Sequence, residues 1–483
     1  METLYLLRFG ELTLKSNAVR RRMVEQLSSN LKDAFQRHDI PYQLHRSWAR
    51  LFLSTTQPEE AESLLKRLFG LSSFSQAAKC PYKDQEDILK FGESFFAEKV
   101  KGKTFAVRAK RDKKLPVSTQ KINIELGSLL YHKGGSVDLS QPQVTCIIEI
   151  REETAYFYEE KLPAPGGLPL GVESKTLTLI SGGFDSPVAA WLMMRRGVPQ
   201  DYLFFELGGD AHRGSIYALL HHLYQYWTYG QRSRLFLIPG KPIIQRLHQD
   251  VPQKFWNVML KRIFYQVGDL IAQKYEHTTL VTGEAVAQVS SQTLSNLRSI
   301  EHGVNIPVLR PLLTYEKNEI IDLSRKIGTH DISAGVQEYC AITPKRPATR
   351  SHPDQVLKYE EQLGGFEFYQ ELAEQVEIIK VHQVDPDQML YLKAVTDQIP
   401  KNAIWIDLRE DLQPPLEHPS VQIPFTDLLA EPEQLEKDKT YLLLCPAGTE
   451  SAELAFILQE MGYDTYSFQG GIVKLNKQLK RES

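Results

Sequence analysis

The chain of 483 residues contains few cysteines, and this scarcity excludes one class of fold. Its four cysteines are Cys80, Cys146, Cys340 and Cys445. A small secreted domain that relies on disulfides has cysteines at a much higher density. The sequence therefore predicts ordinary hydrophobic cores, and it favours a reducing, cytoplasmic environment.

Long apolar runs and a strong net charge are also missing. No run reaches the roughly 20 residues of a membrane-spanning helix, and the N-terminus shows no signal-peptide pattern. We therefore expect no membrane partner. The formal net charge is −3, so any RNA-binding surface must come from local clustering of basic residues. The length predicts roughly three or four domains.

What the sequence does contain is a glycine-rich hexapeptide, Ser181-Gly182-Gly183-Phe184-Asp185-Ser186. The apolar run 176–180 before it predicts a buried parallel strand, and 187–196 after it predicts a helix. Such a turn presents backbone N–H groups beside the positive end of a helix dipole, which favours phosphate binding. It is not a Walker A loop, because no Gly-Lys-Ser/Thr follows the glycines. The pattern resembles the pyrophosphate loop of ATP-cleaving adenylating enzymes.

The region 172–385 alternates strands with helices. Strands are expected at 176–180, 201–205, 234–238 and 278–282, and helices at 187–196, 214–228, 253–275 and 316–327. This alternation predicts a doubly wound parallel sheet with its site at the carboxyl ends of the strands.

Four positions in this region are candidates for ligand contact. Lys261 lies within a long helix and could reach a phosphate, although an ordinary surface lysine is the alternative. Gly283 ends an apolar strand, where a glycine permits close approach of a ligand. Gln292 lies in a polar segment whose alternative is a plain helix cap, and Arg310 brings a further cation near a helix start.

Two smaller α/β units precede this region, at 1–58 and 60–166. The second unit concentrates basic residues around an expected strand at 104–108. These candidate RNA-binding residues are Lys101, Lys103, Arg108, Lys110, Arg111, Lys113 and Lys114. A solvated charged face is the alternative. However, the segment resembles a THUMP RNA-binding domain, and the first unit resembles the ferredoxin-like domain that precedes it, so we expect contacts to phosphates and to RNA shape.

The last unit, 393–483, carries Cys445 on a turn between an expected strand at 441–444 and a helix at 452–461. Backbone N–H groups at such a turn favour a thiolate or a persulfide. A phosphatase would need arginine six positions after the cysteine, and Ser451 stands there. The unit resembles a rhodanese sulfurtransferase domain, although Glu450 stands where many rhodaneses carry arginine.

Together the four units resemble, along nearly the whole chain, the long form of the tRNA 4-thiouridine synthetase family. The resemblance implies ferredoxin-like and THUMP domains, a doubly wound pyrophosphate-loop domain of the adenine nucleotide hydrolase type, and a rhodanese-like domain. It implies that ATP, with Mg²⁺, is held by Leu179, Ile180, Ser181, Gly182, Gly183, Asp185, Ser186, Lys261, Gly283 and Gln292. Asp185 and Lys317 match the residues that activate the uridine.

The implied reaction has two halves. ATP adenylates O4 of uridine 8 in tRNA, and a persulfide on Cys445, received from a cysteine desulfurase, then delivers sulfur to C4. Cys340 would attack Cys445 and leave a disulfide that a reductant resets. The same family also supplies sulfur to the sulfur-carrier protein of thiamine thiazole synthesis.

Two other functions stay open at this point. One is sulfur transfer to an adenylated carrier protein only, which needs Cys445 and not the RNA-binding domains. The other is a non-catalytic tRNA-binding protein, against which the intact Asp185, Lys261 and Cys445 argue. A homodimer is also left open.

Overall fold

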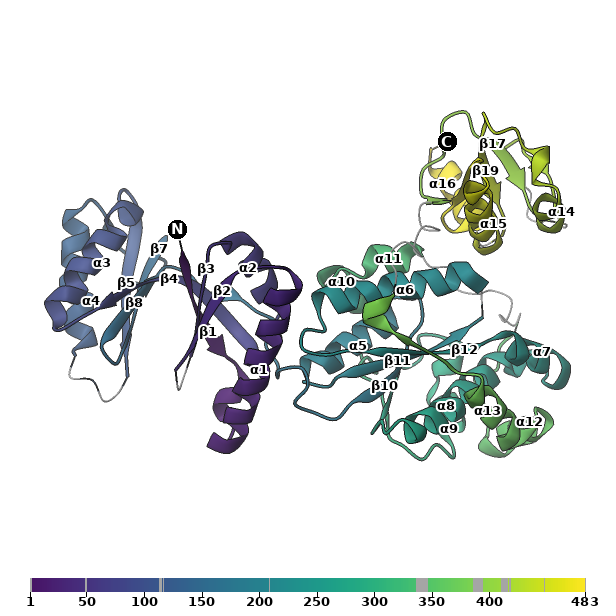
Figure 1. The fold of residues 1–483 in the computed structure, drawn as a ribbon, viewed down its shortest axis with the longest axis horizontal. Coiled ribbons are helices and arrows are strands. Elements are labelled where there is room, and N and C mark those ends of the chain that lie inside the picture. Colours follow the sequence, from purple (N-terminus) through teal and green to yellow (C-terminus); the bar gives the residue numbers. More distant parts are fainter. Residues whose placement is uncertain are drawn as a thin grey trace. The chain divides into compact units, whose positions relative to one another are not determined.

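In the computed structural model the described residues are 2–47, 50–112, 115, 117–207, 209–335, 346–384, 394–409, 416, 418–446 and 448–482. The chain divides into two compact units, Met1–Val172 and Glu173–Ser483 (Figure 1). Both units combine helices with sheets, so the predicted α/β class is confirmed.

Among its described residues, the first unit builds one nine-stranded sheet in the order β2-β3-β1-β4-β8-β7-β5-β6, with β9 on β4. The strands are β1 (Thr3–Phe9), β2 (Tyr42–Arg46), β3 (Leu51–Thr55), β4 (Leu71–Pro81), β5 (Thr104–Arg111), β6 (Ser136–Val137), β7 (Val144–Arg151), β8 (Thr154–Tyr158) and β9 (Leu162–Pro163). The helices are α1 (Asn17–Arg37), α2 (Pro58–Leu65), α3 (Gln85–Val100) and α4 (Thr119–His132).

The long strand β4 is shared by two halves of this sheet. Its first part pairs with β1, with Leu4 opposite Ala77, and its last part pairs with β8, with Ala78 opposite Phe157. β4 was not expected from the sequence, because its small and polar residues lack a clear alternation of apolar and polar side chains. One continuous strand therefore joins the ferredoxin-like half to the half that carries the basic residues.

A buried carboxylate holds the same two halves together. Glu149 on β7 is 6% exposed, and its carboxylate lies 2.5 Å from Arg151, 3.3 Å from Arg50 and 3.9 Å from Arg8 of β1. The hydroxyl of Tyr158 also donates to it at 3.2 Å. Burial alone would raise the pKa of Glu149, but Arg50, Arg151 and Arg8 together hold it below its usual value.

The second unit begins with a six-stranded sheet in the order β14-β13-β10-β11-β12-β15, within the described residues. All its pairings are parallel except that of β15, which is antiparallel to β12. The strands are β10 (Thr176–Leu179), β11 (Gln200–Glu206), β12 (Arg234–Pro239), β13 (Leu280–Val281), β14 (Val308–Leu309) and β15 (Glu377–Lys380). The predicted parallel sheet is confirmed, while the antiparallel edge strand β15 was not expected.

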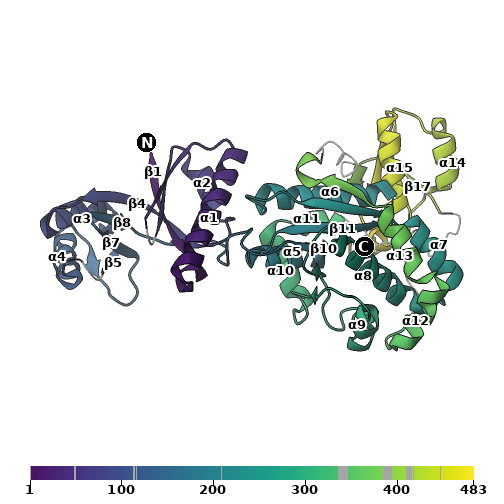
Figure 2. The ribbon, with the colours of Figure 1, turned by 60° about the horizontal axis from the view of Figure 1, so that its bottom comes forward.

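Helices cover both faces of this sheet, with α5 and α6 on one side and α8 and α13 on the other (Figure 1). Figure 2 shows α6 and α8 separated by the strands β10 and β11. Their bounds are α5 (Asp185–Arg195), α6 (Gly209–Tyr226), α7 (Lys241–Asp250), α8 (Trp256–Lys274), α9 (Leu294–Glu301), α10 (Lys317–Ile327), α11 (His330–Gly335), α12 (Pro353–Gln362) and α13 (Gly365–Glu374). The helix expected over 253–275 is a short 3₁₀ turn, Gln253–Phe255, followed by α8.

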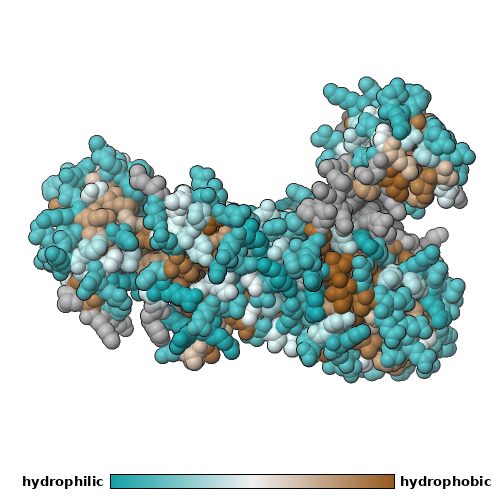
Figure 3. Space-filling view, in the orientation of Figure 1, coloured by the Kyte–Doolittle hydropathy of each residue, from teal (hydrophilic) through white to brown (hydrophobic). Residues whose placement is uncertain are grey.

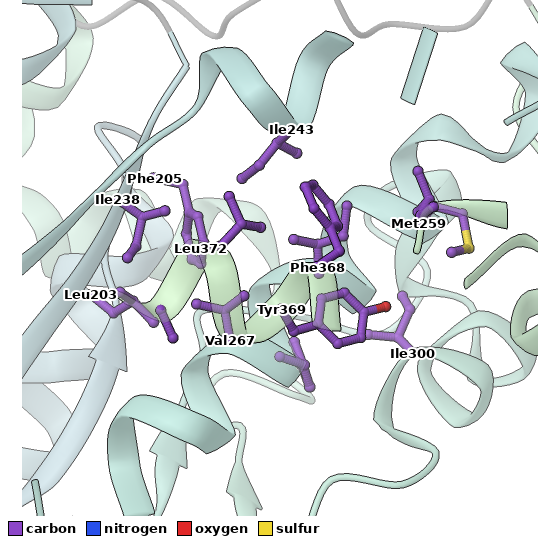
Figure 4. Packing of buried hydrophobic residues seen from close by; sticks show 14 of the residues in the cluster. Leu203, Phe205, Ile238, Ile243, Met259, Val267, Ile300, Phe368, Tyr369 and Leu372 are labelled. Carbon is purple, nitrogen blue, oxygen red and sulfur yellow. The ribbon is translucent and has the colours of Figure 1, made fainter. Parts of the chain in front are cut away.

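The core of this sheet lies under α8. Side chains from the strands, including Leu203 and Ile238, meet Val267 of α8 and Leu372 of α13 (Figure 4). These side chains are almost completely buried. Burial of apolar surface on this scale holds α8 rigidly on the sheet, at roughly 25 cal/mol per Å². The core therefore fixes the position of the α8 backbone, from which the side chains of its N-terminal half project.

The direction of the connections reverses at β10. This strand pairs with β11 on one side and with β13 on the other. The chain first runs outward through β11 and β12, and then returns to β13 and β14. Such a reversal leaves a crevice at the carboxyl ends of the two central strands, which is where ligands bind in open α/β sheets.

The end of the second unit contains a smaller parallel sheet, in the order β16-β20-β19-β17-β18 within the described residues. Its elements are β16 (Val395–Thr396), β17 (Ile404–Asp407), β18 (Val421–Gln422), β19 (Thr440–Leu444), β20 (Asp464–Phe468), α14 (Phe425–Ala430), α15 (Thr449–Glu460) and α16 (Gly471–Glu482). The expected strand at 441–444 and the expected helix at 452–461 correspond to β19 and α15.

Across the described part of the chain, no helix combines the length and hydrophobicity that a membrane crossing needs. Hydrophilic residues cover most of the face in Figure 3, and apolar side chains form separate patches on it. The large apolar side chains lie mainly in the internal cores.

We predict that Glu149→Gln destabilises the protein at pH 7 by about 3 kcal/mol, because it leaves the buried Arg8 and the partly buried Arg50 and Arg151 without their shared negative charge. A carboxylate with a lowered folded pKa stabilises the fold above its unfolded pKa, and this contribution is lost as pH falls through the folded pKa. The wild type should therefore lose more stability on acidification below about pH 4 than the variant does. Urea unfolding of the intact protein at pH 7 and at lower pH measures both effects.

Glu25→Gln provides the matched control. Glu25 forms an ion pair with Arg21 on the surface of α1, where both side chains are more than half exposed. Its loss should cost less than about 0.5 kcal/mol. Equal effects of the two substitutions would show that the arginine cluster around Glu149 does not stabilise the unit.

Candidate active site

The hydroxyl of Ser186 shapes the glycine-rich loop. It accepts a hydrogen bond from the backbone N–H of Ser181 at 2.9 Å, donates to the carbonyl of Ser181 at 3.0 Å, and lies 3.1 Å from the Ser181 hydroxyl. These bonds close the chain into a ring that includes the first two residues of α5, which begins at Asp185. The loop amides stand at the N-terminus of this helix, where the dipole favours an anion.

An ion pair brings Asp185 and Lys317 together, although 132 positions separate them in the sequence. The ammonium of Lys317 donates to Asp185 Oδ1 at 2.7 Å, and the amide of Gln288 donates to Oδ2 at 3.4 Å. Lys317 is the first residue of α10, whose start is held by a reciprocal capping box between Glu316 and Glu319. Both partners remain partly exposed, so a ligand in the crevice could contact either one.

Gly283 lies directly against the start of α5. A Cβ atom at this position would be 2.7 Å from the backbone nitrogen of Ser186 and 2.8 Å from the carbonyl carbon of Asp185. Both atoms belong to the backbone, so neither can move aside cheaply. From the sequence, this glycine was expected to permit close approach of a ligand. In the structure it permits close approach of two parts of the protein itself.

The other proposed nucleotide residues surround the same crevice in different ways. Lys261 of α8 is partly buried and makes no hydrogen bond or ion pair to the described residues, whereas its neighbour Arg262 is buried against Glu360 and several carbonyls. Leu179 packs on the core and Ile180 is 5% exposed. The side chain of Ile180 is therefore not available to a ligand, whereas that of Leu179 remains partly exposed.

A buried network adjoins Gly283 and was not identified from the sequence. Glu284 accepts hydrogen bonds from the hydroxyl of Tyr265 and from Arg310 Nε, the latter at 3.1 Å. Arg310 also lies 2.8 Å from Glu301. From the sequence, Arg310 was expected to bring a further cation near a helix start. In the structure its guanidinium instead pairs with the carboxylates of Glu284 and Glu301. The only sequence signal for this network was spacing. Tyr265 lies one helical turn after Lys261, and Glu284 directly follows Gly283.

The second candidate centre is the sulfur of Cys445, at the end of β19. The residue is 1% exposed. The sulfur accepts from the backbone N–H of Gly448 at 2.9 Å and of Ser451 at 3.4 Å, and from the Ser451 hydroxyl at 3.3 Å. Gly448 has φ +85°, a left-handed conformation that turns its N–H toward the sulfur and favours glycine. These donors would stabilise negative charge on sulfur.

Neighbouring elements support this cysteine loop. The N–H of Ile472, at the start of α16, donates to the carbonyl of Cys445 at 3.0 Å. This hydrogen bond ties the start of α16 to the cysteine loop. Arg409 forms a buried pair with Asp407, with nitrogen–oxygen distances of 2.9 and 2.7 Å. Glu450 is exposed.

The thiols described are free, and the partner cysteine is not described. Cys80, Cys146 and Cys445 form no disulfide, and the proposed resolving residue Cys340 lies outside the described residues. Burial raises the pKa of Cys146 to about 12, so this thiol stays protonated. A disulfide between Cys340 and Cys445 stays a prediction.

The basic residues of the first unit lie on and around β5. Lys101, Lys103 and Lys110 are exposed and make no hydrogen bond or ion pair to described residues. Arg108 donates to the carbonyl of Leu139 at 2.6 Å and Arg111 to that of Leu115, so these two are partly structural. Lys113 and Lys114 lie outside the described residues.

Three family profiles match successive parts of the chain. They are described as ThiI ferredoxin-like domain at 4–75, THUMP domain at 82–159 and Thiamine biosynthesis protein (ThiI) at 171–364. The tRNA sulfurtransferase of Pyrobaculum aerophilum is 33% identical over 473 residues, which cover 96% of each chain. The chain belongs to the tRNA sulfurtransferase family.

Two further likenesses agree with membership of the tRNA sulfurtransferase family. A probable tRNA sulfurtransferase of Saccharolobus islandicus is 38% identical over 374 residues, covering 77% of this chain and 98% of the relative. A crystal structure of a 4-thiouridine synthetase in complex with RNA and bound ATP is 29% identical, with a TM-score of 0.70 over 79% of this chain and all of that chain. The family and the predicted fold class are confirmed, whereas the rhodanese-like assignment of the last unit stays a prediction.

We predict that Gly283→Ala lowers the stability of this tRNA sulfurtransferase by about 1–3 kcal/mol, because a methyl group must displace the start of α5. Gly127→Ala is the control. Gly127 lies inside α4, and no atom lies within 4 Å of the place that an added methyl group would occupy, so alanine there should stabilise by about 0.5–1 kcal/mol. Urea unfolding of both variants measures the difference, and a neutral Gly283→Ala would contradict the close contact.

Proposed function

We propose that this protein uses ATP to transfer persulfide sulfur to uridine 8 of tRNA, giving 4-thiouridine. The observation that carries the proposal is the Asp185–Lys317 ion pair beside the phosphate-binding loop. It combines a proton acceptor, a cation and helix N-terminal amides at a strand-end crevice. The solved relative named as a 4-thiouridine synthetase contains RNA and ATP, which supports the same substrates here.

The first half of the reaction activates uridine. Its O4 attacks the α-phosphorus of ATP, the bond to pyrophosphate breaks, and Asp185 accepts the N3 proton as the adenylate forms. Lys261, Lys317 and the loop amides stabilise the charge that develops on the phosphates. Gly283 and Gln292 form the wall of the nucleotide site on the side of β13. AMP then becomes the leaving group on C4.

Magnesium fits this arrangement as a companion of the nucleotide. The described residues contain no group of three or more His, Cys, Asp or Glu able to hold a metal ion. Magnesium at nucleotide sites is held by one or two carboxylates together with the substrate phosphates, and Asp185 is a carboxylate at the loop. When bound, the ion neutralises phosphate charge.

The second half transfers sulfur. A cysteine desulfurase supplies a sulfur atom to Cys445, and the N–H and O–H donors around its sulfur stabilise the persulfide anion. The terminal sulfur attacks C4 and AMP leaves. The thiolate of Cys340 attacks the inner sulfur of Cys445, which releases 4-thiouridine and leaves a disulfide, and a dithiol reductant restores both thiols.

An alternative use of the same persulfide is sulfur donation to the carrier protein of thiamine thiazole synthesis. The profile described as Thiamine biosynthesis protein favours it. This pathway requires Cys445 and not the basic residues on β5. One persulfide on Cys445 could serve both acceptors, and we propose tRNA as the main acceptor.

We predict that Asp185→Ala and Lys317→Met each lower tRNA thiolation by at least about a hundredfold, because each removes a general acid–base or charge-stabilising group. Cys445→Ser should abolish thiolation from a desulfurase and cysteine. The measurement is 4-thiouridine formation in purified unmodified tRNA, read from its near-ultraviolet absorbance, with ATP, Mg²⁺, desulfurase and reductant present.

Free sulfide separates the two halves of the reaction. With sulfide as donor, Cys445→Ser should regain thiolation, because adenylation is intact, whereas Asp185→Ala should not. Cys146→Ser is the control thiol, buried and unrelated to the loop. No thiolation by the wild type under either condition would contradict the proposal and leave the carrier-protein function.

We predict that Lys110→Ala weakens tRNA binding severalfold and lowers the slope of log affinity against log salt by about 1, because one phosphate contact is lost. Burial lowers the pKa of nearby Lys161, and the positive charge of Lys110 lowers it further, as expected for a basic surface. Lys90→Ala is the control, since Glu86 lies 2.8 Å from that ammonium. Equal salt slopes in wild type and Lys110→Ala would identify β5 as an ordinary solvated face.

A further inference from the structure

The carboxylate of Glu284 has an uneven set of partners. Its side chain is 2% exposed. One oxygen, Oε2, accepts from the hydroxyl of Tyr265, from Thr282 Oγ1 at 3.1 Å and from Arg310 Nε at 3.1 Å. The other oxygen, Oε1, is buried and has no hydrogen-bond partner among the described residues. Three donors therefore hold one oxygen of the carboxylate, and the other oxygen lacks a donor among the described residues.

A buried carboxylate oxygen without a donor is costly, because it has lost water and gained nothing in return. Arg310 does not remove this cost, since the same guanidinium also contacts Glu301 at 2.8 Å and the Tyr265 hydroxyl at 3.2 Å. Proteins keep such a group mainly where a ligand or an ordered water completes it. The location of Glu284 indicates whether a ligand or a water completes this oxygen.

Glu284 follows Gly283 at the carboxyl end of β13, on the side of the crevice that faces the loop after β10. The backbone of Gly283 touches the start of α5, so the neighbouring carboxylate is within the same strand-end region. Gln292, on the 3₁₀ turn Ser290–Gln292, also has a buried side-chain oxygen, Oε1, without a partner among the described residues. This side of the crevice therefore offers acceptors that lack donors.

The chemistry of these acceptors selects one part of ATP. Phosphate oxygens are themselves acceptors and carry negative charge, so they are repelled by a carboxylate. The donors on ATP belong to its nucleoside, namely the two ribose hydroxyls and the 6-amino group of adenine. A hydrogen bond from one of these to an ionised carboxylate is of the stronger, charge-assisted kind.

We propose that Glu284 determines specificity for the nucleoside of ATP, with Oε1 accepting a hydrogen bond from a ribose hydroxyl or from the 6-amino group. Tyr265, Thr282 and Arg310 are the positioning residues that hold Oε2 and so aim the free oxygen. This assignment rests on the proposed ATP site, and it specifies which part of ATP the site recognises.

The test compares binding of four nucleotides by calorimetry, using the intact protein with Mg²⁺. They are ATP, 2′-deoxy-ATP, 3′-deoxy-ATP and purine ribonucleoside triphosphate, which lacks the 6-amino group. The wild type should bind one of the three analogues roughly tenfold or more weakly than ATP. The analogue that loses affinity identifies the donor.

Glu284→Gln should remove this discrimination, because an amide N–H₂ replaces Oε1 as the group facing the donor. The variant should bind ATP about as weakly as the wild type binds the critical analogue, and the two losses should not add. Tyr265→Phe is the matched control. It removes a donor from the Oε2 side, so any loss of affinity should be equal for all four nucleotides.

Two results would overturn the assignment. One is a wild type that binds all three analogues within about twofold of ATP, which needs no variant and is unaffected by any folding defect. The other is a folded Glu284→Gln that keeps the wild-type discrimination. A wild type that binds no ATP would overturn the proposed function together with this assignment, so the two failures are distinguishable.

Discussion

The close contact between Gly283 and the start of α5 is the constraint on which the nucleotide domain depends. It brings the ends of β10 and β13 together at the point where the sheet connections reverse. Because neither backbone has room for a side chain between them, the phosphate loop and the β13 end behave as one rigid part. Asp185, which pairs with Lys317, belongs to the α5 side of this contact, and Glu284 directly follows Gly283.

The two chemical centres share one physical device. In each, a short turn between a parallel strand and a helix presents backbone N–H groups that would stabilise a negative charge, on phosphate at the first centre and on sulfur at the second. At Cys445 the donors are Gly448 and Ser451, and the contacts described to the sulfur include no cation. Neutral donors of this kind stabilise an anion without forming an ion pair that must later be broken. This arrangement would suit a sulfur atom that is passed on to an acceptor.

Local patterns were sufficient for much of this architecture. The hexapeptide 181–186 and Cys445 stand on strand-to-helix turns, as expected, because strand periodicity, helix caps and glycine are encoded within a few residues. The sequence could not reveal the ion pair of Asp185 with Lys317 or the burial of Arg310, because these depend on contacts between distant segments. The strand β4 was missed for a related reason: its pairing with β1 and β8, rather than its own composition, makes it a strand.

The shared strand β4 has a consequence for how the first unit is inherited and how it unfolds. A strand that belongs to two half-sheets cannot be assigned to one of them without exposing the edge of the other. The two halves should therefore open as a single cooperative unit rather than as separate foldons. We therefore expect gene rearrangements that shuffle domains to keep the two halves together.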